Sequence, residues 1–481
     1  MTAFINRDHE IQGLEERWGL TRQVALLWGR RRIGKSTLLQ RFAERKPNIF
    51  YQAVRGTATE QLIGLTDRIQ AYRHDPVLAA APLANWRAAI AYLLALARRA
   101  KVDGHPLLVV LDEFPYLVSA NLDLPSLFQA ALEDVRREDL PLYLVLAGSQ
   151  ITMFEQHVLH GPLFSRRTWG EQLPPLSYLD AGKFMPGWSP ADRLRAWAIL
   201  GGIPYYLEQF DPGHSLAWNV ENRMLRKGQV LYSEAELFVA EELGTESATY
   251  LSIIAAVAAG ATRQSEIADR AGISSSAAPP YLAQLKRLHV VEHSRPHGAA
   301  ASSRSGIWQI ADGYLRFWFR FIRPNLTDLE ARRSHEIFRQ RVAPALDHFV
   351  SKPAFEVACR EHAAASFGRD PEFPAAGEVG AWWGQVPDER QPGTRRTREG
   401  EIEIVAYAGK ALVLAGEAKW HDGEVDTDAL DQLEGTVRFV PGYGPHTKLV
   451  VYARDGFTDE LRRRAASSGV VLRTVGDLYA G

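Results

Sequence analysis

Residues 29–37, GRRRIGKST, decide the fold of the N-terminal part of the chain. The first eight match the pattern GxxxxGK[ST], with an apolar run, VALLW, before them and a helix-forming run, STLLQRFAE, overlapping their end. Glycines in this pattern let successive backbone N–H groups surround phosphate oxygens at a helix N-terminus, where the helix dipole also favours negative charge. The sequence therefore predicts a phosphate-binding P-loop between a strand and a helix.

The side chains of this loop predict a site for a purine nucleoside triphosphate, ATP, with Mg²⁺. Lys35 is expected to reach the β and γ phosphates, and the Ser36 hydroxyl to ligate Mg²⁺. Three consecutive arginines raise the affinity for anions, and DNA or a neighbouring subunit is an alternative partner for some of them. The predicted nucleotide-binding residues are Gly29, Arg30, Arg31, Arg32, Ile33, Gly34, Lys35, Ser36 and Thr37.

Two acids at the end of a later apolar run predict that the bound nucleotide is also hydrolysed. LLVVLDEF at residues 107–114 carries Asp112 and Glu113 at the carboxyl end of a predicted buried strand. Asp112 is expected to hold Mg²⁺ through water, and Glu113 to orient or deprotonate the attacking water. An acid pair that merely opens a surface loop is the alternative.

Polar residues also follow the next apolar run, LYLVLAG at 142–148. Ser149 and Gln150 are placed to sense the γ phosphate or to fix the water, although a simple loop start fits them equally. Arg166 is a candidate arginine finger, in cis or in trans, with a solvated charge as the alternative.

The composition describes a folded, water-soluble protein of several domains. The chain is 46% hydrophobic and 23% charged, as in a folded protein. Its 481 residues are too many for a single hydrophobic core. The net charge of -1 excludes a protein that coats nucleic acid by bulk charge, so any such site is local. The single cysteine excludes an internal disulfide, and no apolar stretch reaches the roughly 18 residues that span a membrane. We expect a cytoplasmic protein with no membrane partner.

The chain is expected to fold as four α/β and helical parts. Short apolar runs alternate with helical patterns in residues 1–174, which predicts a mostly parallel sheet covered by helices. Residues 175–245 indicate a helical lid. Three helices and two strands in 246–325 predict a winged helix-turn-helix. Residues 326–481 read as a linker helix and a last α/β domain.

The predicted winged helix carries basic residues where DNA would approach. Lys286 and Arg287 lie on its third helix, which is expected to open with serine caps and to be shortened by two prolines, and Arg295 and Arg304 lie in or near the wing. These residues favour contacts with DNA phosphates or bases. A lid or a docking surface is the alternative for such a module.

A charged hairpin is predicted near the C-terminus. EIEIVAY at 401–407 alternates strictly, so Glu401 and Glu403 share one face. If ALVLAGEAKW folds back antiparallel, Glu417 and Lys419 arrive beside Glu403. Two carboxylates and a lysine at a strand end can bind a divalent ion and hold a water near a scissile phosphate.

Several motifs together resemble the archaeal-type ATPase family, a prokaryotic branch of the additional-strand P-loop ATPases near the AAA+ and STAND groups. The resemblance implies that Arg7 and Glu10 belong to the family's opening hhGRxxE motif, in which Asn6 stands where Gly is more usual. It also implies that Pro204 packs by the nucleotide base. These motifs are FINRDHE, GRRRIGKST, LDEFPYL, LAGSQ, LFSRRT and GGIPYYL.

The hairpin in turn resembles the PD-(D/E)XK nuclease signature, an acid followed by ExK. By that resemblance Glu403, Glu417 and Lys419 are the catalytic residues, and Glu356 is the acid of the first helix. Mg²⁺ or Mn²⁺ would bind Glu356, Glu403 and Glu417, although Glu403 replaces the usual Asp. An inactive, nuclease-like domain used for interaction is the alternative.

Together these features predict an ATP-driven, DNA-associated protein in which nucleotide state gates the winged helix and the nuclease-like module, with self-association as a further possibility. The alternative is a STAND-like switch that binds ATP tightly, turns over slowly and works through protein contacts.

Overall fold

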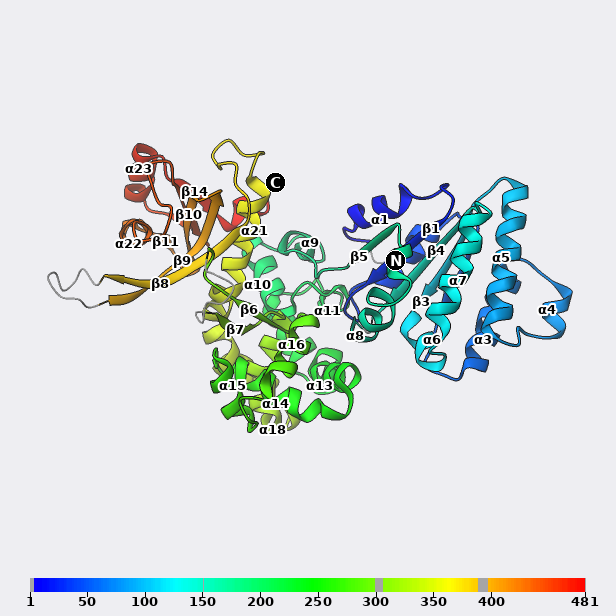
Figure 1. Ribbon diagram of the computed structural model, residues 1–481. Coiled ribbons are helices and arrows are strands. Elements are labelled where there is room, and N and C mark those ends of the chain that lie inside the picture. The colour runs from blue at the N-terminus through cyan, green and yellow to red at the C-terminus, as the bar shows by residue number, and fades with distance from the viewer. Residues whose placement is uncertain (1–3, 150, 299–305, 388–396, 481) are drawn as a thin grey trace. The chain divides into compact units, whose positions relative to one another are not determined.

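The computed structural model describes residues 4–149, 151–298, 306–387 and 397–480. The chain divides into two compact units, Met1–Pro175 and Leu176–Gly481, which Figure 1 shows in blue to cyan and in green to red. No helix in the described ranges is both long and apolar enough to cross a membrane.

The first unit is built on a parallel five-stranded sheet in the order β2-β3-β4-β1-β5. Its central strands β3 and β4 are buried throughout, as their continuous apolar runs predict. The strands are β1 Gln23–Trp28, β2 Asn48–Gln52, β3 Leu107–Asp112, β4 Leu142–Gly148 and β5 Trp169–Gln172. β1, β3 and β4 coincide with the apolar runs VALLW, LLVVLDEF and LYLVLAG. β5 was not predicted, because WGEQ carries no apolar alternation and becomes a strand only by pairing with the edge of β1.

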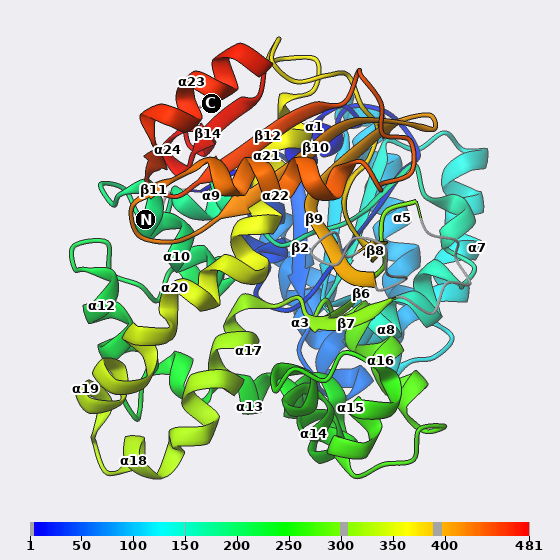
Figure 2. The ribbon, with the colours of Figure 1, turned by 90° about the vertical axis from the view of Figure 1, so that its left-hand side faces the viewer.

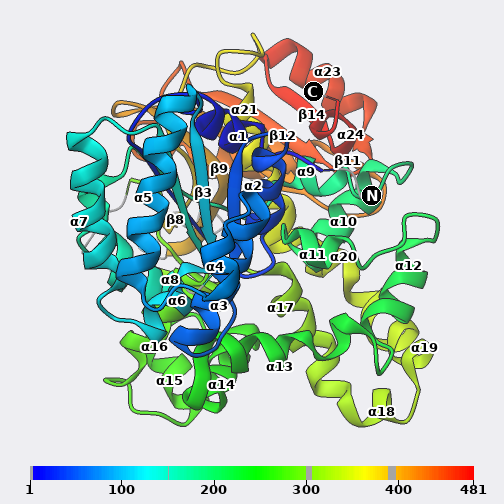
Figure 3. The ribbon, with the colours of Figure 1, turned by 90° about the vertical axis from the view of Figure 1, so that its right-hand side faces the viewer.

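Helices cover both faces of this sheet (Figures 1 and 3). One face packs against α3, α5 and α7 in a single apolar core. On the other face Phe42 of α2 meets Tyr143 of β4 edge to face, with ring centroids 5.8 Å apart. The helices are α1 Asp8–Glu15, α2 Lys35–Ala43, α3 Ala58–Tyr72, α4 Pro76–Ala80, α5 Trp86–Asp103, α6 Phe114–Ala120, α7 Leu124–Arg137 and α8 Ile151–Phe154, followed by short turns at Glu155–Leu159 and Phe164–Arg166.

The second unit begins with helices and no strand over residues 176–245. They are α9 Tyr178–Gly182, α10 Pro190–Leu200, α11 Pro204–Leu207, α12 Leu216–Asn219 and α13 Val230–Leu243, with a π-helical turn at Val220–Met224 and a 3₁₀ turn at Gly244–Glu246.

Three helices and an antiparallel hairpin follow, in the predicted order. They are α14 Ser247–Ala258, α15 Gln264–Ala271, α16 Ala278–Arg287, β6 Val291–Ser294 and β7 Ile307–Ile310. The serine caps expected for α16 are wrong, since its cap is Ala277 without a side-chain hydrogen bond. Pro279 and Pro280 lie in its first turn, where a backbone N–H is not needed, so they begin the helix and do not shorten it.

A run of short helices then connects the hairpin to a second sheet. The run comprises α17 Gly313–Phe317, α18 Leu326–Glu330, α19 Ser334–Ile337, α20 Leu346–Phe349 and α21 Glu356–Ser366, joined by π and 3₁₀ turns at Trp318–Ile322, Arg323–Asn325, Phe338–Val342, Ala343–Ala345 and Val350–Phe355.

The second sheet has the order β14-β12-β10-β9-β8, with β8, β9 and β10 antiparallel and β12 and β14 parallel to β10. Figure 2 shows α22 lying along this sheet, and its apolar side chains share one core with β9 and β10. The elements are β8 Val379–Pro387, β9 Thr397–Ala408, β10 Ala411–Lys419, β11 Glu424–Val425, α22 Thr427–Val437, β12 Lys448–Ala453, β13 Gly456–Phe457, α23 Asp459–Ser468, β14 Val471–Thr474 and α24 Val475–Leu478.

The turn after α10 leaves no room for a side chain at Gly202. The Leu176 N–H donates to the Gly202 carbonyl at 2.7 Å, and a Cβ on Gly202 would lie 2.1 Å from the Leu176 carbonyl oxygen. Because that neighbour is backbone, it cannot move aside cheaply.

We therefore expect Gly202→Ala to destabilise the second unit by about 1–3 kcal/mol, measured by urea unfolding. Gly435→Ala in α22 is the matched control, since a Cβ there meets nothing within 4 Å, and it should be neutral or stabilising by about 0.5–1 kcal/mol. Equal unfolding midpoints for the two variants would contradict this account.

Candidate nucleotide-binding site

The loop between β1 and α2 has the backbone that its sequence predicts. Gly29 and Gly34 have φ angles of 154° and 94°, in the region that favours glycine. Lys35, 4% exposed, begins α2, and its ammonium donates to the carbonyls of Gly29 at 2.9 Å and Arg30 at 3.1 Å. The lysine therefore lies folded over the loop that the predicted phosphates would occupy. Thr37 is exposed in the first turn of α2.

Ser36 and Asp112 come together from two elements far apart in sequence. The Ser36 hydroxyl on α2 donates to a carboxylate oxygen of Asp112, at the end of β3, at 2.6 Å. Asp112 is fully buried, and this burial raises the pKa of its carboxyl group, while the Ser36 hydrogen bond and the Lys35 charge act in the opposite direction. Two adjacent hard oxygen groups of this kind match the ligand chemistry of Mg²⁺.

Glu113 is held by the neighbouring strand. One oxygen of its carboxylate accepts both the Ser149 N–H at 3.1 Å and the Ser149 hydroxyl at 2.7 Å. Glu113 has φ 55°, and its own N–H donates to Asp112 at 3.0 Å. The two acids and Ser149 therefore form one hydrogen-bonded group at the carboxyl edge of β3 and β4. Gln150 lies outside the described residues.

The N-terminal segment lies against the P-loop. Arg7, 5% exposed, donates to Glu10 at 3.0 Å, to the Ile33 carbonyl at 3.4 Å and to the Pro174 carbonyl at 2.8 Å. Asn6 has φ 59°, so this turn takes the left-handed conformation that glycine favours and that asparagine also tolerates. The first and last segments of the unit thus meet at the loop backbone through one guanidinium.

The three arginines of the loop have different surroundings. Arg30 is 3% exposed, Arg32 has φ 67°, and Arg31 donates to the Tyr116 hydroxyl on α6 at 3.1 Å. Tyr116 also lies beneath the Arg55 guanidinium, 5.9 Å from the ring centroid. Sequence reasoning missed Tyr116, whose only signal was its place three residues after Glu113.

Two further predicted site residues have contacts of their own. Arg166 forms an ion pair with Glu133 of α7. Pro204 belongs to the second unit, where it begins α11. Their roles as an arginine finger and as a contact of the base stay predictions.

The predicted acidic cluster of the second unit forms on β9 and β10. These strands are antiparallel, with Gly416 opposite Ile404, so Glu403 and Glu417 become neighbours. Lys419 approaches Glu417 to 2.5 Å and Gln432 of α22 to 3.4 Å. Burial raises the pKa of Glu403, and the Glu417 carboxylate raises it further.

The predicted metal set differs from the structure in one respect. Glu356, Glu403 and Glu417 were expected to bind a metal together, but no three carboxylates, histidines or cysteines among the described residues form a group that could hold one. Glu356 is instead engaged by Lys352 at 3.5 Å and Arg360 at 3.9 Å. The cations of its own helical segment therefore satisfy this acid.

Comparison with known proteins agrees with the nucleotide site. Residues 4–210 match a family described as an ATPase domain predominantly from Archaea, and residues 318–430 match a family of archaeal and bacterial proteins of unknown function. An uncharacterized protein of Methanocaldococcus jannaschii is 28% identical over 331 residues, covering 68% of this chain and 70% of that protein. An uncharacterized ATP-binding protein of the same organism is 41% identical over 47 residues, or 10% of this chain and 80% of that protein.

Among solved structures, a Walker-type ATPase of Pyrococcus abyssi is similar over 66% of this chain and 96% of its own, with 23% identity and a TM-score of 0.49. The family match and the P-loop geometry together lead to one conclusion: the chain is an ATPase, and its residues 4–210 are similar to a family of ATPase domains found predominantly in Archaea.

Proposed function

We propose that the P-loop site hydrolyses ATP with Mg²⁺, and that Glu113 is the group that activates the water. The observation that carries this proposal is the joined arrangement of Ser36, Asp112, Glu113 and Ser149 at one edge of the sheet. An acid that only opened a surface loop would not share its carboxylate with the end of the adjacent strand.

Each of these residues has a separate task in the proposal. Ser36 and Asp112 hold Mg²⁺, which, when bound, neutralises negative charge on the phosphate oxygens. Glu113 accepts a proton from water or orients it. Ser149 is a positioning residue, because its N–H and hydroxyl both bind the same oxygen of Glu113 and leave the other oxygen for water.

Glu113→Gln is expected to lower the turnover of ATP by about 10²–10⁴-fold, because the amide cannot accept a proton, while affinity for a fluorescent ATP analogue is retained. Phosphate release measures the first quantity and fluorescence titration the second. Glu44→Gln is the matched control, since Glu44 is exposed and pairs with Arg41. Lys35→Ala should lose nucleotide binding itself. Normal turnover by Glu113→Gln would contradict the assignment of the base.

We also propose that the chain associates with DNA through α16 and the β6–β7 hairpin. Lys286 and Arg287 end α16 and are exposed, and Arg295 is exposed beside β6. Cations on the elements that enter or flank a groove are the usual footprint of such a module. Arg304 lies outside the described residues.

Reversing both charges, Lys286→Glu with Arg287→Glu, should weaken binding to duplex DNA and lower the dependence of log Kd on log salt by about two units. Fluorescence anisotropy at several salt concentrations measures both quantities. The control is Arg339→Glu with Arg341→Glu, two exposed arginines of one helical turn outside the module. Unchanged binding in the first pair refutes the contact. ATP turnover that no form of DNA stimulates favours the alternative, a slow regulatory switch.

A second candidate activity is metal-dependent cleavage of DNA at β9 and β10. It is favoured by the buried pair Glu403 and Glu417 with Lys419 at 2.5 Å, because Mg²⁺ is often held by only two carboxylates together with substrate phosphates. Glu356 is not needed in this arrangement. The alternative for the same residues is an inactive domain that serves interaction.

Wild-type protein is expected to nick or linearise plasmid DNA with Mg²⁺ or Mn²⁺, and Glu417→Ala to abolish this while ATP turnover persists. Glu424→Ala, at an exposed position of β11, is the matched control. If the wild type leaves the plasmid intact in every nucleotide state, the nuclease candidate is wrong and the interaction role remains.

A further inference from the structure

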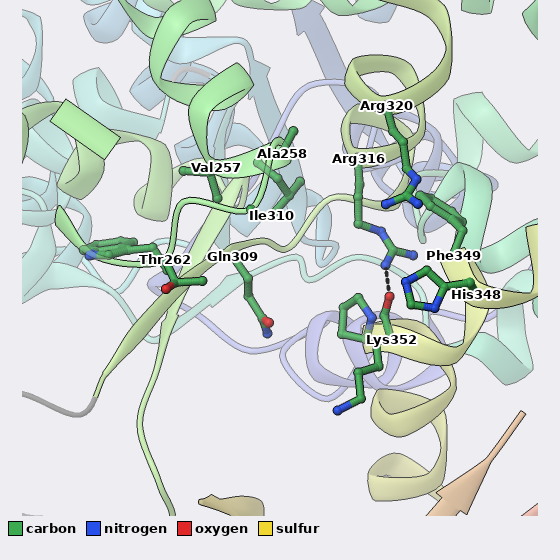
Figure 4. A pocket seen from close by; sticks show the side chains of 13 residues that line it. Val257, Ala258, Thr262, Gln309, Ile310, Arg316, Arg320, His348, Phe349 and Lys352 are labelled. Atoms are coloured by element: carbon green, nitrogen blue, oxygen red, sulfur yellow. Dashed lines mark hydrogen bonds between the residues drawn. The ribbon is translucent and has the colours of Figure 1, made fainter. Parts of the chain in front are cut away.

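A cavity of about 240 Å³ lies within the second unit, and its lining includes none of the residues named above as contacts of ATP or DNA. On one side it is bounded by α14 and β7, and on the other by the segments around α17 and α20. Figure 4 shows Val257, Ala258, Ile310, Gln309 and Thr262 facing Arg316, Arg320, His348 and Phe349 across it. The two sides differ sharply in chemistry.

The second side is cationic and held in place. Arg316 and Arg320 are four residues apart on one helical segment and so lie on the same face. The Arg316 guanidinium lies over the Phe349 ring, 3.8 Å from its centroid, and donates to the Lys352 carbonyl at 2.5 Å. His348 and Lys352 complete this side. Contacts of this kind fix the direction of the Arg316 charge before any ligand arrives.

In the described part of the chain Arg316 and Arg320 form no ion pair, and Glu356, which pairs with Lys352, acts on the Arg316 charge only from beyond ion-pair distance. Among the described residues, no carboxylate lies within 4.0 Å of Arg316 or Arg320, and none of the residues that line the cavity is acidic. Burial lowers the pKa of Arg316 to about 9, and the charge of Arg320 acts in the same direction. Arg316 therefore stays charged at neutral pH in a place where an anion would stabilise it.

Lys352 differs from the two arginines, because carboxylates already neutralise it. Its ammonium donates to Glu401 of β9 at 2.8 Å and approaches Glu356 of α21 to 3.5 Å. Although burial acts to lower it, these two carboxylates raise the pKa of Lys352. Lys352 thus joins the cavity to the strand that carries Glu403.

The first side supplies apolar surface and few free donors. Val257, Ala258, Ile310 and Trp308 line it, and the Gln309 amide is already bonded to Glu292. The volume is about eight times the roughly 30 Å³ that one water occupies in the liquid. There is room for a phosphate group on the arginines with part of a sugar or base against the apolar side.

We propose that this cavity binds a phosphate group of a nucleic-acid strand through Arg316 and Arg320. The proposal rests on the DNA association proposed above and gives it a second point of contact. Trp308 and Ile310 of β7 line the cavity, and so does Lys352, whose ammonium donates to Glu401 of β9. A nucleic-acid strand with a phosphate group in this cavity would run from α16 and the β6–β7 hairpin toward the carboxylates of β9 and β10.

The test uses the full chain with Arg320→Ala combined with Arg316→Lys, which keeps one charge but removes the guanidinium fork. Binding of a fluorescent oligonucleotide is measured by anisotropy against salt. We expect about a tenfold loss of affinity and a fall of about one unit in the slope of log Kd against log salt, as the loss of one phosphate contact predicts. Arg323→Ala is the matched control, since Arg323 is exposed on the same segment and does not line the cavity.

Arg320→Ala alone is a control for misfolding of the double variant, because Arg320 is exposed. It should show a smaller loss of affinity for the oligonucleotide. If the wild type binds the oligonucleotide and both variants match it, the cavity proposal is overturned while the DNA association stands. If the wild type binds no DNA, both fall. AMP binding, measured in the Lys35→Ala background, separates the two sources of a phosphate group. If the Arg316 and Arg320 substitutions abolish AMP binding but leave DNA binding intact, the cavity binds a free nucleotide, and the proposal of a nucleic-acid strand is overturned.

Discussion

The nucleotide site depends on the order β3-β4-β1 in a parallel sheet. Parallel strands end at a common edge, so this order alone brings the P-loop after β1 and the acids after β3 to either side of Ser149. The hydrogen bond from Ser36 to Asp112 and the two from Ser149 to Glu113 follow from it. A strand inserted between any two of the three would separate the groups that the proposed hydrolysis needs at one phosphate.

A second constraint is the burial of charge at that edge. Asp112 is fully buried, Lys35 is 4% exposed and Arg7 is 5% exposed, so each must be satisfied by the protein. Carbonyls of the loop accept from Lys35, and carbonyls of Ile33 and Pro174 accept from Arg7. These two cations therefore hold the backbone of the loop in shape.

The second unit also buries charge, but satisfies it differently. Glu403 and Glu417 lie together with the pKa of Glu403 raised, whereas Glu356 is matched by Lys352 and Arg360. Arg316 and Arg320 have no such partner among the described residues. The charge of Arg316 and Arg320 suits a phosphate group, and the paired carboxyl groups of Glu403 and Glu417 suit a cation. The two proposals for nucleic acid rest on these two features.

The sequence by itself determined the local pieces of this protein. The letters GRRRIGKST specify a loop whose glycines need positive φ, and continuous apolar runs specify β1, β3 and β4 as buried strands. Strict alternation in EIEIVAY likewise identified the strand that carries Glu401 and Glu403. These features are short-range, so the residue types are enough to predict them.

Only the tertiary structure decided which side chains meet. The strand β5 forms because it pairs with the edge of β1, and Arg31 donates to Tyr116 because α6 packs beside the loop. Glu356 forms ion pairs with Lys352 and Arg360. The cavity around Arg316 unites residues from α14 to Pro353 that no spacing in the sequence connects. Pairings of this kind depend on long-range packing and on where buried charge can be satisfied, and the local sequence pattern predicts neither.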